Sequence, residues 1–127
     1  MTAVRGVRGA TTVAANDRDQ IVSATKGLLE RIVALNGMVP DDVASVWFTV
    51  TPDLDAEFPA VAARGIGWTD VPLICGREIP VPGSLERCIR VLIHWNTDRA
   101  QSEVRHAFLR EARALRPQWA VDEREAT

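Results

Sequence analysis

Arg90 is the residue whose surroundings most directly suggest chemistry. It interrupts an apolar run, and no other charge lies between Arg87 and Asp98. A guanidinium taken out of water costs several kcal/mol unless an anion and further hydrogen bonds meet it. Two interpretations are open. Arg90 pairs with an internal carboxylate such as Glu78 or Glu86, or it faces a pocket and binds an anionic ligand.

Three further arginines stand at or near the ends of expected elements. Arg8 lies among glycines, which let another group approach the backbone closely. Arg64 ends a short predicted helix and Arg116 follows the last one, where a cation also favours the helix dipole. Each has a simple structural explanation, an edge-strand charge in the case of Arg8. Since no acidic residue lies within two positions of any of them or of Arg90, the set favours an anion site.

Composition excludes several classes of protein. The 127 residues, 46% hydrophobic and 25% charged, suit one domain over 1–127, with 116–127 as a flexible tail. A net charge of −2 argues against a nucleic-acid partner. No stretch approaches the ~18 apolar residues that span a bilayer. Arg5 and Arg8 stand where a signal peptide needs its apolar core, so we expect a cytoplasmic protein without membrane partners.

The cysteines and histidines do not indicate a metal or a general base. Cys75 and Cys88 lie thirteen positions apart and are expected to be reduced, buried thiols. His94 and His106 do not complete the set of about four ligands that structural zinc needs, so no metal is predicted. They are interpreted as a strand-face and a helix-surface residue. With no glycine-rich phosphate loop and no Ser-His-Asp order, the sequence does not support nucleotide or hydrolytic chemistry.

Hydrophobic periodicity predicts the elements that must position these residues. Strands are expected at 4–13, 43–51, 68–75 and 85–97. One helix is expected from Asn16 or Asp17 to Asn36 and a short one at 59–65. A last helix is expected to begin at Asp98 or Ser102, with an apolar stripe formed by Val104, Ala107, Phe108, Ala112 and Leu115. The segment 43–51 is too apolar to be half-exposed. The order β-α-β-α-β-β-α predicts an α/β (α+β) sandwich, a mixed sheet with helices on one face. The apolar opposite face then needs cover, most simply by self-association.

Five motifs follow one family's pattern in order: RGVRGATTV, TPDLDAEFPA, VPLIC, CIRVLI and the LRP that ends at Pro117. Over roughly residues 4 to 117 the chain resembles the monofunctional, trimeric α/β chorismate mutases of the Bacillus type. The resemblance implies a homotrimer, a pseudo-barrel with the sheets in its core and active sites at subunit interfaces. It also implies that chorismate is rearranged to prephenate in Phe and Tyr biosynthesis, by a Claisen-type pericyclic reaction without cofactor or metal.

The resemblance assigns roles to individual residues. Arg90 stabilises the ether oxygen, Arg8 holds a carboxylate and Glu78 accepts a hydrogen bond from the ring hydroxyl. The substrate-binding residues are Phe58, Ala60, Arg64, Leu73, Ile74, Cys75, Phe108, Leu115 and Arg116. Two positions depart from the pattern: Val61 replaces a common lysine and Phe108 a common tyrosine. A lost donor of this kind is worth about 1 kcal/mol, which bears on affinity more than on the chemical step.

Two other interpretations remain beside the mutase. One is a trimeric metabolite-binding or deaminase-like protein that holds a different carboxylate. The other is a non-catalytic interaction module in which Arg90 is merely paired inside. Catalysis without a titrating base predicts a rate that varies little between about pH 6 and 9.

Overall fold

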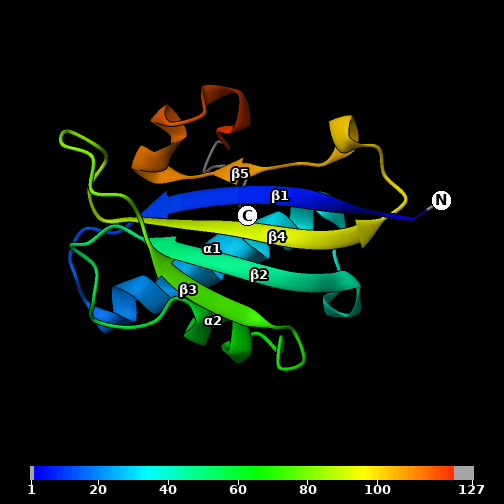
Figure 1. Cartoon of the computed structure of the whole chain (residues 1–127), viewed down its shortest axis with the longest axis horizontal. Coiled ribbons are helices and arrows are strands. Elements are labelled where there is room, and N and C mark those ends of the chain that lie inside the picture. The colour runs from blue at the N-terminus through cyan, green and yellow to red at the C-terminus, as the bar shows by residue number, and fades with distance from the viewer. Residues whose placement is uncertain (1, 122–127) are drawn as a thin grey trace.

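A five-stranded sheet in the order β3-β2-β4-β1-β5 is the centre of the computed structural model, which describes residues 2–121 (Figure 1). The strands are β1 (Ala3–Thr12), β2 (Val43–Val50), β3 (Leu73–Arg77), β4 (Cys88–Thr97) and β5 (Ala107–Phe108). The helices are α1 (Arg18–Asn36) and α2 (Ala60–Gly65), with 3-10 turns η1 (Pro40–Asp42), η2 (Gln101–Glu103), η3 (Arg110–Ala114) and η4 (Pro117–Trp119). Strand β4 is antiparallel to β1 and β2, whereas β2–β3 and β1–β5 are parallel, so the predicted mixed α/β sheet is confirmed.

Helices α1 and α2 lie together on one face of the sheet (Figure 1). Asp17 caps α1 by accepting a hydrogen bond from the backbone N–H of Gln20. The helix ends at Gly37, whose φ of 65° suits a residue without a Cβ. Both limits agree with the sequence-based prediction. None of the described helices is long and apolar enough to cross a membrane.

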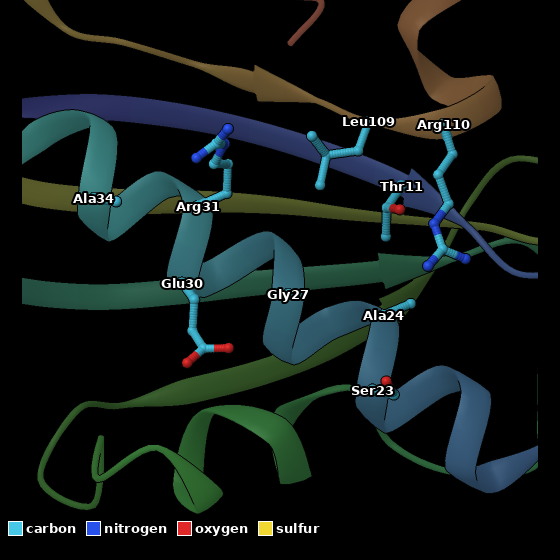
Figure 2. A pocket seen from close by; sticks show the side chains of 9 residues that line it. All are labelled: Thr11, Ser23, Ala24, Gly27, Glu30, Arg31, Ala34, Leu109 and Arg110. Carbon is cyan, nitrogen blue, oxygen red and sulfur yellow. The ribbon is translucent and has the colours of Figure 1, made fainter. Parts of the chain in front are cut away.

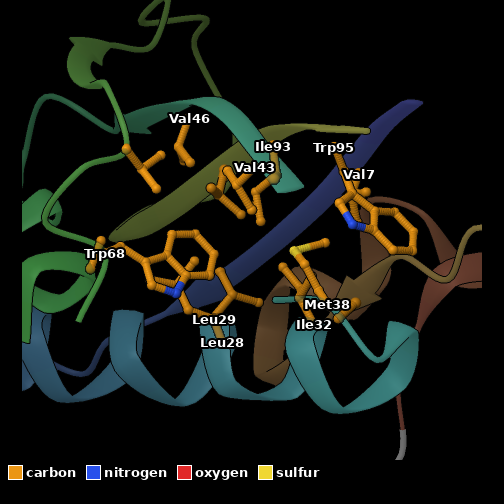
Figure 3. Packing of buried hydrophobic residues seen from close by; sticks show 14 of the residues in the cluster. Val7, Leu28, Leu29, Ile32, Met38, Val43, Val46, Trp68, Ile93 and Trp95 are labelled. Atoms are coloured by element: carbon orange, nitrogen blue, oxygen red, sulfur yellow. The ribbon is translucent and has the colours of Figure 1, made fainter. Parts of the chain in front are cut away.

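The core lies between α1 and the sheet, and alternate strand residues fill it (Figure 3). Strand β4 contributes Val91 and Ile93, and β2 contributes Val46 and Phe48. Gly9 on β1 allows the close approach of α1, because a Cβ there would lie only 2.7 Å from Cδ1 of Ile32. The spacing of strand and helix therefore depends on a missing side chain.

Two strand predictions were inaccurate in detail. Segment 43–51 is not wholly interior, since Trp47 on β2 is 48% exposed. The third strand begins at Leu73 rather than at 68, because Trp68 packs into the core and the proline before the strand has no N–H to donate. It continues through Arg77, into a stretch expected to be a loop. It is an edge strand, as Pro72 indicated.

The predicted last helix was wrong. Residues 101–114 form η2, then β5, then η3, although the apolar residues expected on its stripe are largely buried. Ala107 and Phe108 pair with Gly9 and Ala10 of β1, and Leu109 donates its N–H to the Ala10 carbonyl at 2.9 Å. Pairing with a strand a hundred residues away thus overrides the local periodicity. Of the predicted flexible tail, Pro117–Trp119 form η4, and 122–127 lie outside the described residues.

Candidate functional site

Arg8, Glu78 and Arg90 lie together on the face of the sheet opposite to α1. Arg90 on β4 pairs in register with Thr49 of β2, and Arg8 lies on the neighbouring strand β1. The Nε of Arg90 is 3.8 Å from Oε2 of Glu78, and the two side chains are only 27% and 25% exposed. A cavity of about 350 Å³ contains all three residues, with Trp47, Thr49, Val91 and Leu92 completing its lining. Both interpretations of Arg90 are therefore partly correct: it pairs with Glu78 and it faces a pocket.

Glu78 is held in this cavity from two sides. It follows the last residue of β3, and its backbone N–H donates to the Val50 carbonyl at 2.9 Å. The hydroxyl of Thr49 donates a hydrogen bond to its carboxylate. With one oxygen held by Thr49 and the other free to accept, Glu78 can bind a hydroxyl group of a ligand.

The electrostatics of the cavity are dominated by cations. Burial lowers the pKa of the Arg8 guanidinium from its ordinary value, and the nearby Arg90 lowers it further. The Glu78 carboxylate raises the pKa of Arg8, and Arg116 lowers it. Together, the guanidinium groups of Arg8, Arg90 and Arg116 and the Glu78 carboxylate carry a formal charge of +2, although Arg116 does not line the cavity. This charge suits a ligand with two negative charges.

The segment from β5 to η4 lies beside Arg8, although none of its residues lines the cavity. Phe108 is fully buried, and Cζ of Arg8 lies 5.7 Å from the centre of its ring. Leu115 packs against the buried cluster around Phe108. Arg116 lies over the ring of Trp119, with Cζ 4.0 Å from the ring centre. Phe108, Leu115 and Arg116 thus lie near Arg8, and their predicted contact with substrate stays a prediction.

The other predicted binding residues, apart from Ile74, form a second group on the helix-covered side. Burial raises the pKa of the Cys75 thiol. The backbone N–H of Ala60 and the Arg64 guanidinium lower this pKa, but their effects are smaller. Cys75 also shares a cavity of about 400 Å³ with Phe58, whose side chain is 65% exposed. Leu73 packs on the main core. Ile74 pairs in register with Trp47 and is 50% exposed.

A single chain does not bring the two groups together. Cys75 pairs in register with Phe48, and Arg90 pairs with Thr49. Since consecutive strand residues point to opposite faces, the two groups flank the sheet. The thiol that lies close to Arg90 is that of Cys88, on the same strand. Burial raises the pKa of the Cys88 thiol, and Arg90 lowers it.

Sequence reasoning missed several residues at this site. Trp47 and Thr49 line the cavity, and the alternation along β2 could have indicated their shared face. The prediction that His106 lies on a helix surface was wrong, because the chain before β5 is not helical. The His106 Nδ1 accepts a hydrogen bond from the Arg8 backbone N–H at 2.9 Å. No local pattern could have indicated that contact, which joins residues 98 positions apart.

A separate hollow of about 410 Å³ lies between α1 and the segment after β5 (Figure 2). Arg31, Arg110 and Glu30 line it, together with hydroxyl and apolar side chains. None of the predicted site residues lines this hollow. Within residues 2–121, no three His, Cys, Asp or Glu side chains come together as a metal site.

Comparison with known proteins gives a consistent result. A family model described as chorismate mutase type I matches residues 4–119. The chain is 54% identical over 115 residues to chorismate mutase AroH of Thermus thermophilus, covering 90% of this chain and 94% of that protein. It is 44% identical over 115 residues to chorismate mutase AroH of Bacillus subtilis (strain 168), covering 90% and 91%. A solved structure of a chorismate mutase from Clostridium thermocellum aligns with a TM-score of 0.85 at 51% identity, covering 86% of this chain and 97% of that one.

Proposed function

This chain belongs to the chorismate mutase type I family, and we propose that the cavity around Arg90, Glu78 and Arg8 performs its reaction. The protein is an isomerase of aromatic amino-acid biosynthesis that rearranges chorismate to prephenate. In this rearrangement the ether C–O bond breaks as a C–C bond forms within the same molecule. All atoms are retained, and no proton transfer is needed. The protein must therefore select the folded conformer and stabilise the charge that develops on the ether oxygen.

The observation that carries the assignment is the state of the Arg90 side chain. Its Nε is buried without a hydrogen-bond partner among the described residues, since Glu78 lies 3.8 Å away. A buried donor of this kind is costly unless a ligand atom meets it. An ether oxygen that gains negative charge fits the donor, and the fixed guanidinium needs little reorganisation as the charge develops.

Arg8 and Glu78 complete the recognition of the substrate. Chorismate carries two carboxylates, which balance the +2 charge of Arg8, Arg90, Arg116 and Glu78 taken together. Arg8 binds one carboxylate through its planar fork. Glu78 accepts a hydrogen bond from the ring hydroxyl, with Thr49 fixing the orientation of its carboxylate.

The complete site is formed between adjacent copies in a homotrimer. The Arg90 face exposes apolar area at Trp47 and Ile74, which a neighbouring copy would cover. The second group, Phe58, Ala60, Arg64 and Cys75, flanks the sheet on the other side and would face Arg90 of the next copy. Sheets in the core of the trimer would form the expected pseudo-barrel. A cytoplasmic location, expected from the sequence, remains part of this proposal.

The first experiment measures chorismate loss in plain buffer with a chelator, with prephenate identified as the product. Rapid conversion is expected, since the rearrangement needs neither metal nor cofactor. A folded trimer that leaves chorismate unchanged would contradict the assignment and favour the binding-protein interpretation.

A mixing experiment tests the shared site. Arg90→Ala removes the cation of one group, and Arg64→Glu reverses an exposed charge in the other. Each variant alone is expected to have little activity. Co-refolded in equal amounts, they should regain about a quarter of the parental activity, because random assembly pairs an intact Arg90 face with an intact Arg64 group at that frequency. A mixture no more active than its separate components would show that each copy contains its own complete site.

A further inference from the structure

His106 occupies the junction between the substrate-binding strand β1 and the segment after β5. Its Nδ1 accepts the backbone N–H of Arg8 at 2.9 Å. The β1–β5 pairing begins only at Gly9 and Ala107, one residue further along both strands. The imidazole therefore takes the place of a sheet carbonyl at Arg8. This hydrogen bond fixes the main chain from which the Arg8 guanidinium extends.

The imidazole ring also contacts Trp119. The two ring centres are 4.0 Å apart with an interplanar angle of 42°. Trp119 in turn lies 4.0 Å below Cζ of Arg116 and 5.8 Å from the ring centre of Phe108. We call this arrangement of His106, Trp119 and Arg116 against β1 the His106 column. It connects two of the three cations of the site.

The column requires a neutral imidazole. Nδ1 can accept a hydrogen bond only while it carries no proton. Burial lowers the pKa of His106, and the guanidinium groups of Arg8 and Arg116 lower it further. Arg8 reaches the ring from β1 and Arg116 from the C-terminal segment, and no carboxylate among the described residues offsets them. A proton on Nδ1 would place two N–H groups against each other and add a cation between two others.

We propose that His106 is a positioning residue that fixes Arg8 directly and Arg116 through Trp119, and that its protonation releases both arginines. This role rests on the proposed function, because it matters for catalysis only if the arginines bind the substrate. Acid should then weaken substrate binding while the enzyme stays folded.

The test is the pH profile of kcat/KM for the wild type and two variants. His106→Asn places an amide oxygen close to the position of Nδ1 and cannot titrate, whereas His106→Leu offers no acceptor. We expect the wild type to lose kcat/KM below about pH 6, with a midpoint under the ordinary histidine value of about 6.5. His106→Asn should keep most neutral activity and lose this acid limb. His106→Leu should raise KM about tenfold at every pH, with a smaller change in kcat.

An acid limb that persists unchanged in His106→Asn would overturn the proposal, as would an unaltered KM in His106→Leu. Nitrogen NMR of the wild type gives an independent measurement, with His94 as the only other imidazole in the chain. The His106 ring should be the tautomer protonated on Nε2 at neutral pH. A ring protonated on Nδ1 would contradict the geometry even if the chain had no mutase activity, so failure of the proposal and failure of the proposed function are distinguishable.

Discussion

The two faces of the sheet are built from consecutive residues of the same strands and differ in their chemistry. On β4, Ile93 is buried against α1, whereas Arg90 and Leu92 line the cavity on the other face. The helix-covered face is held by apolar burial and close packing. The open face holds cations that a dianion would balance. Since neighbours in sequence belong to different faces, substitutions one position apart should separate catalysis from stability.

Arg90→Lys should have the largest effect on catalysis. Lysine keeps the charge and loses the planar fork, so kcat should fall by about 10²–10³-fold. The free energy of unfolding should change by less than about 1 kcal/mol, because the side chain adds no core packing. Steady-state kinetics and urea unfolding at equal protein concentration measure the two quantities.

The matched control is Arg105→Lys, the same chemical change at an exposed arginine whose hydrogen bonds to Asn36 use only its backbone. It should leave both quantities unchanged. Parental turnover by a folded Arg90→Lys or Arg90→Ala variant would contradict the mechanism.

Ile93→Ala should have the converse effect. Its side chain is fully buried on the helix-covered face, so truncation should cost about 2–5 kcal/mol of stability. The kcat per folded enzyme should stay near the parental value, because Ile93 does not line the cavity. Ile93→Val serves as the graded control, at about 0.5–1.5 kcal/mol. A kcat loss as large as that of Arg90→Lys would show that the two faces are coupled.

Thr49→Val tests a smaller contribution of the open face, the positioning of Glu78 by the Thr49 hydroxyl. The variant removes the hydroxyl that donates to Glu78 and nearly preserves the volume, so kcat/KM should fall about fivefold, equivalent to ~1 kcal/mol. Ser45→Ala on the same strand removes a hydroxyl that bonds His94 instead, and it should leave kcat/KM unchanged. Equal losses in both variants would indicate a general effect of β2 rather than the positioning of Glu78.

Phe108→Tyr is expected to have the smallest effect and the opposite sign. A hydroxyl near Arg8 would restore the hydrogen-bond donor that the family resemblance implies at this position, lowering KM up to about fivefold at constant kcat. Loss of stability with an unchanged KM would instead place the hydroxyl inside the buried cluster with Ala112.

Local patterns in the sequence predicted the fold up to the last strand–helix junction. The caps at Asp17 and Gly37 and the alternation along β4 depend on neighbouring residues, so they can be read from the sequence. The structure of segment 98–115 could not be predicted from local patterns, because Ala107 and Phe108 form hydrogen bonds with β1 that no local signal indicates. The short apolar spacing there suited a helix equally well.

The site was predictable to a similar extent. The alternation of side chains along β4 puts Arg90 and Cys88 on one face, as in the structure. The sequence alone offered Glu78 or Glu86 as a partner of Arg90 and grouped Arg8 with Arg64, Arg90 and Arg116. The choice of Arg8, Glu78 and Arg90 as the central set came from the family resemblance. Thr49 and His106 were missed because each acts through one side-chain hydrogen bond to a distant residue.

Arg8 and its neighbour Gly9 also have a consequence for how the chain folds. If β1 shifted by one residue against β4, Arg8 would point at Leu28 and Ile32 of α1, where a Cβ alone already meets their side chains. The guanidinium would be desolvated without an anion, and the glycine would leave a gap on the opposite face. The desolvated guanidinium on one face and the gap on the other therefore both disfavour the misregistered sheet. A residue that binds substrate in the native state thereby helps to select the strand register during folding.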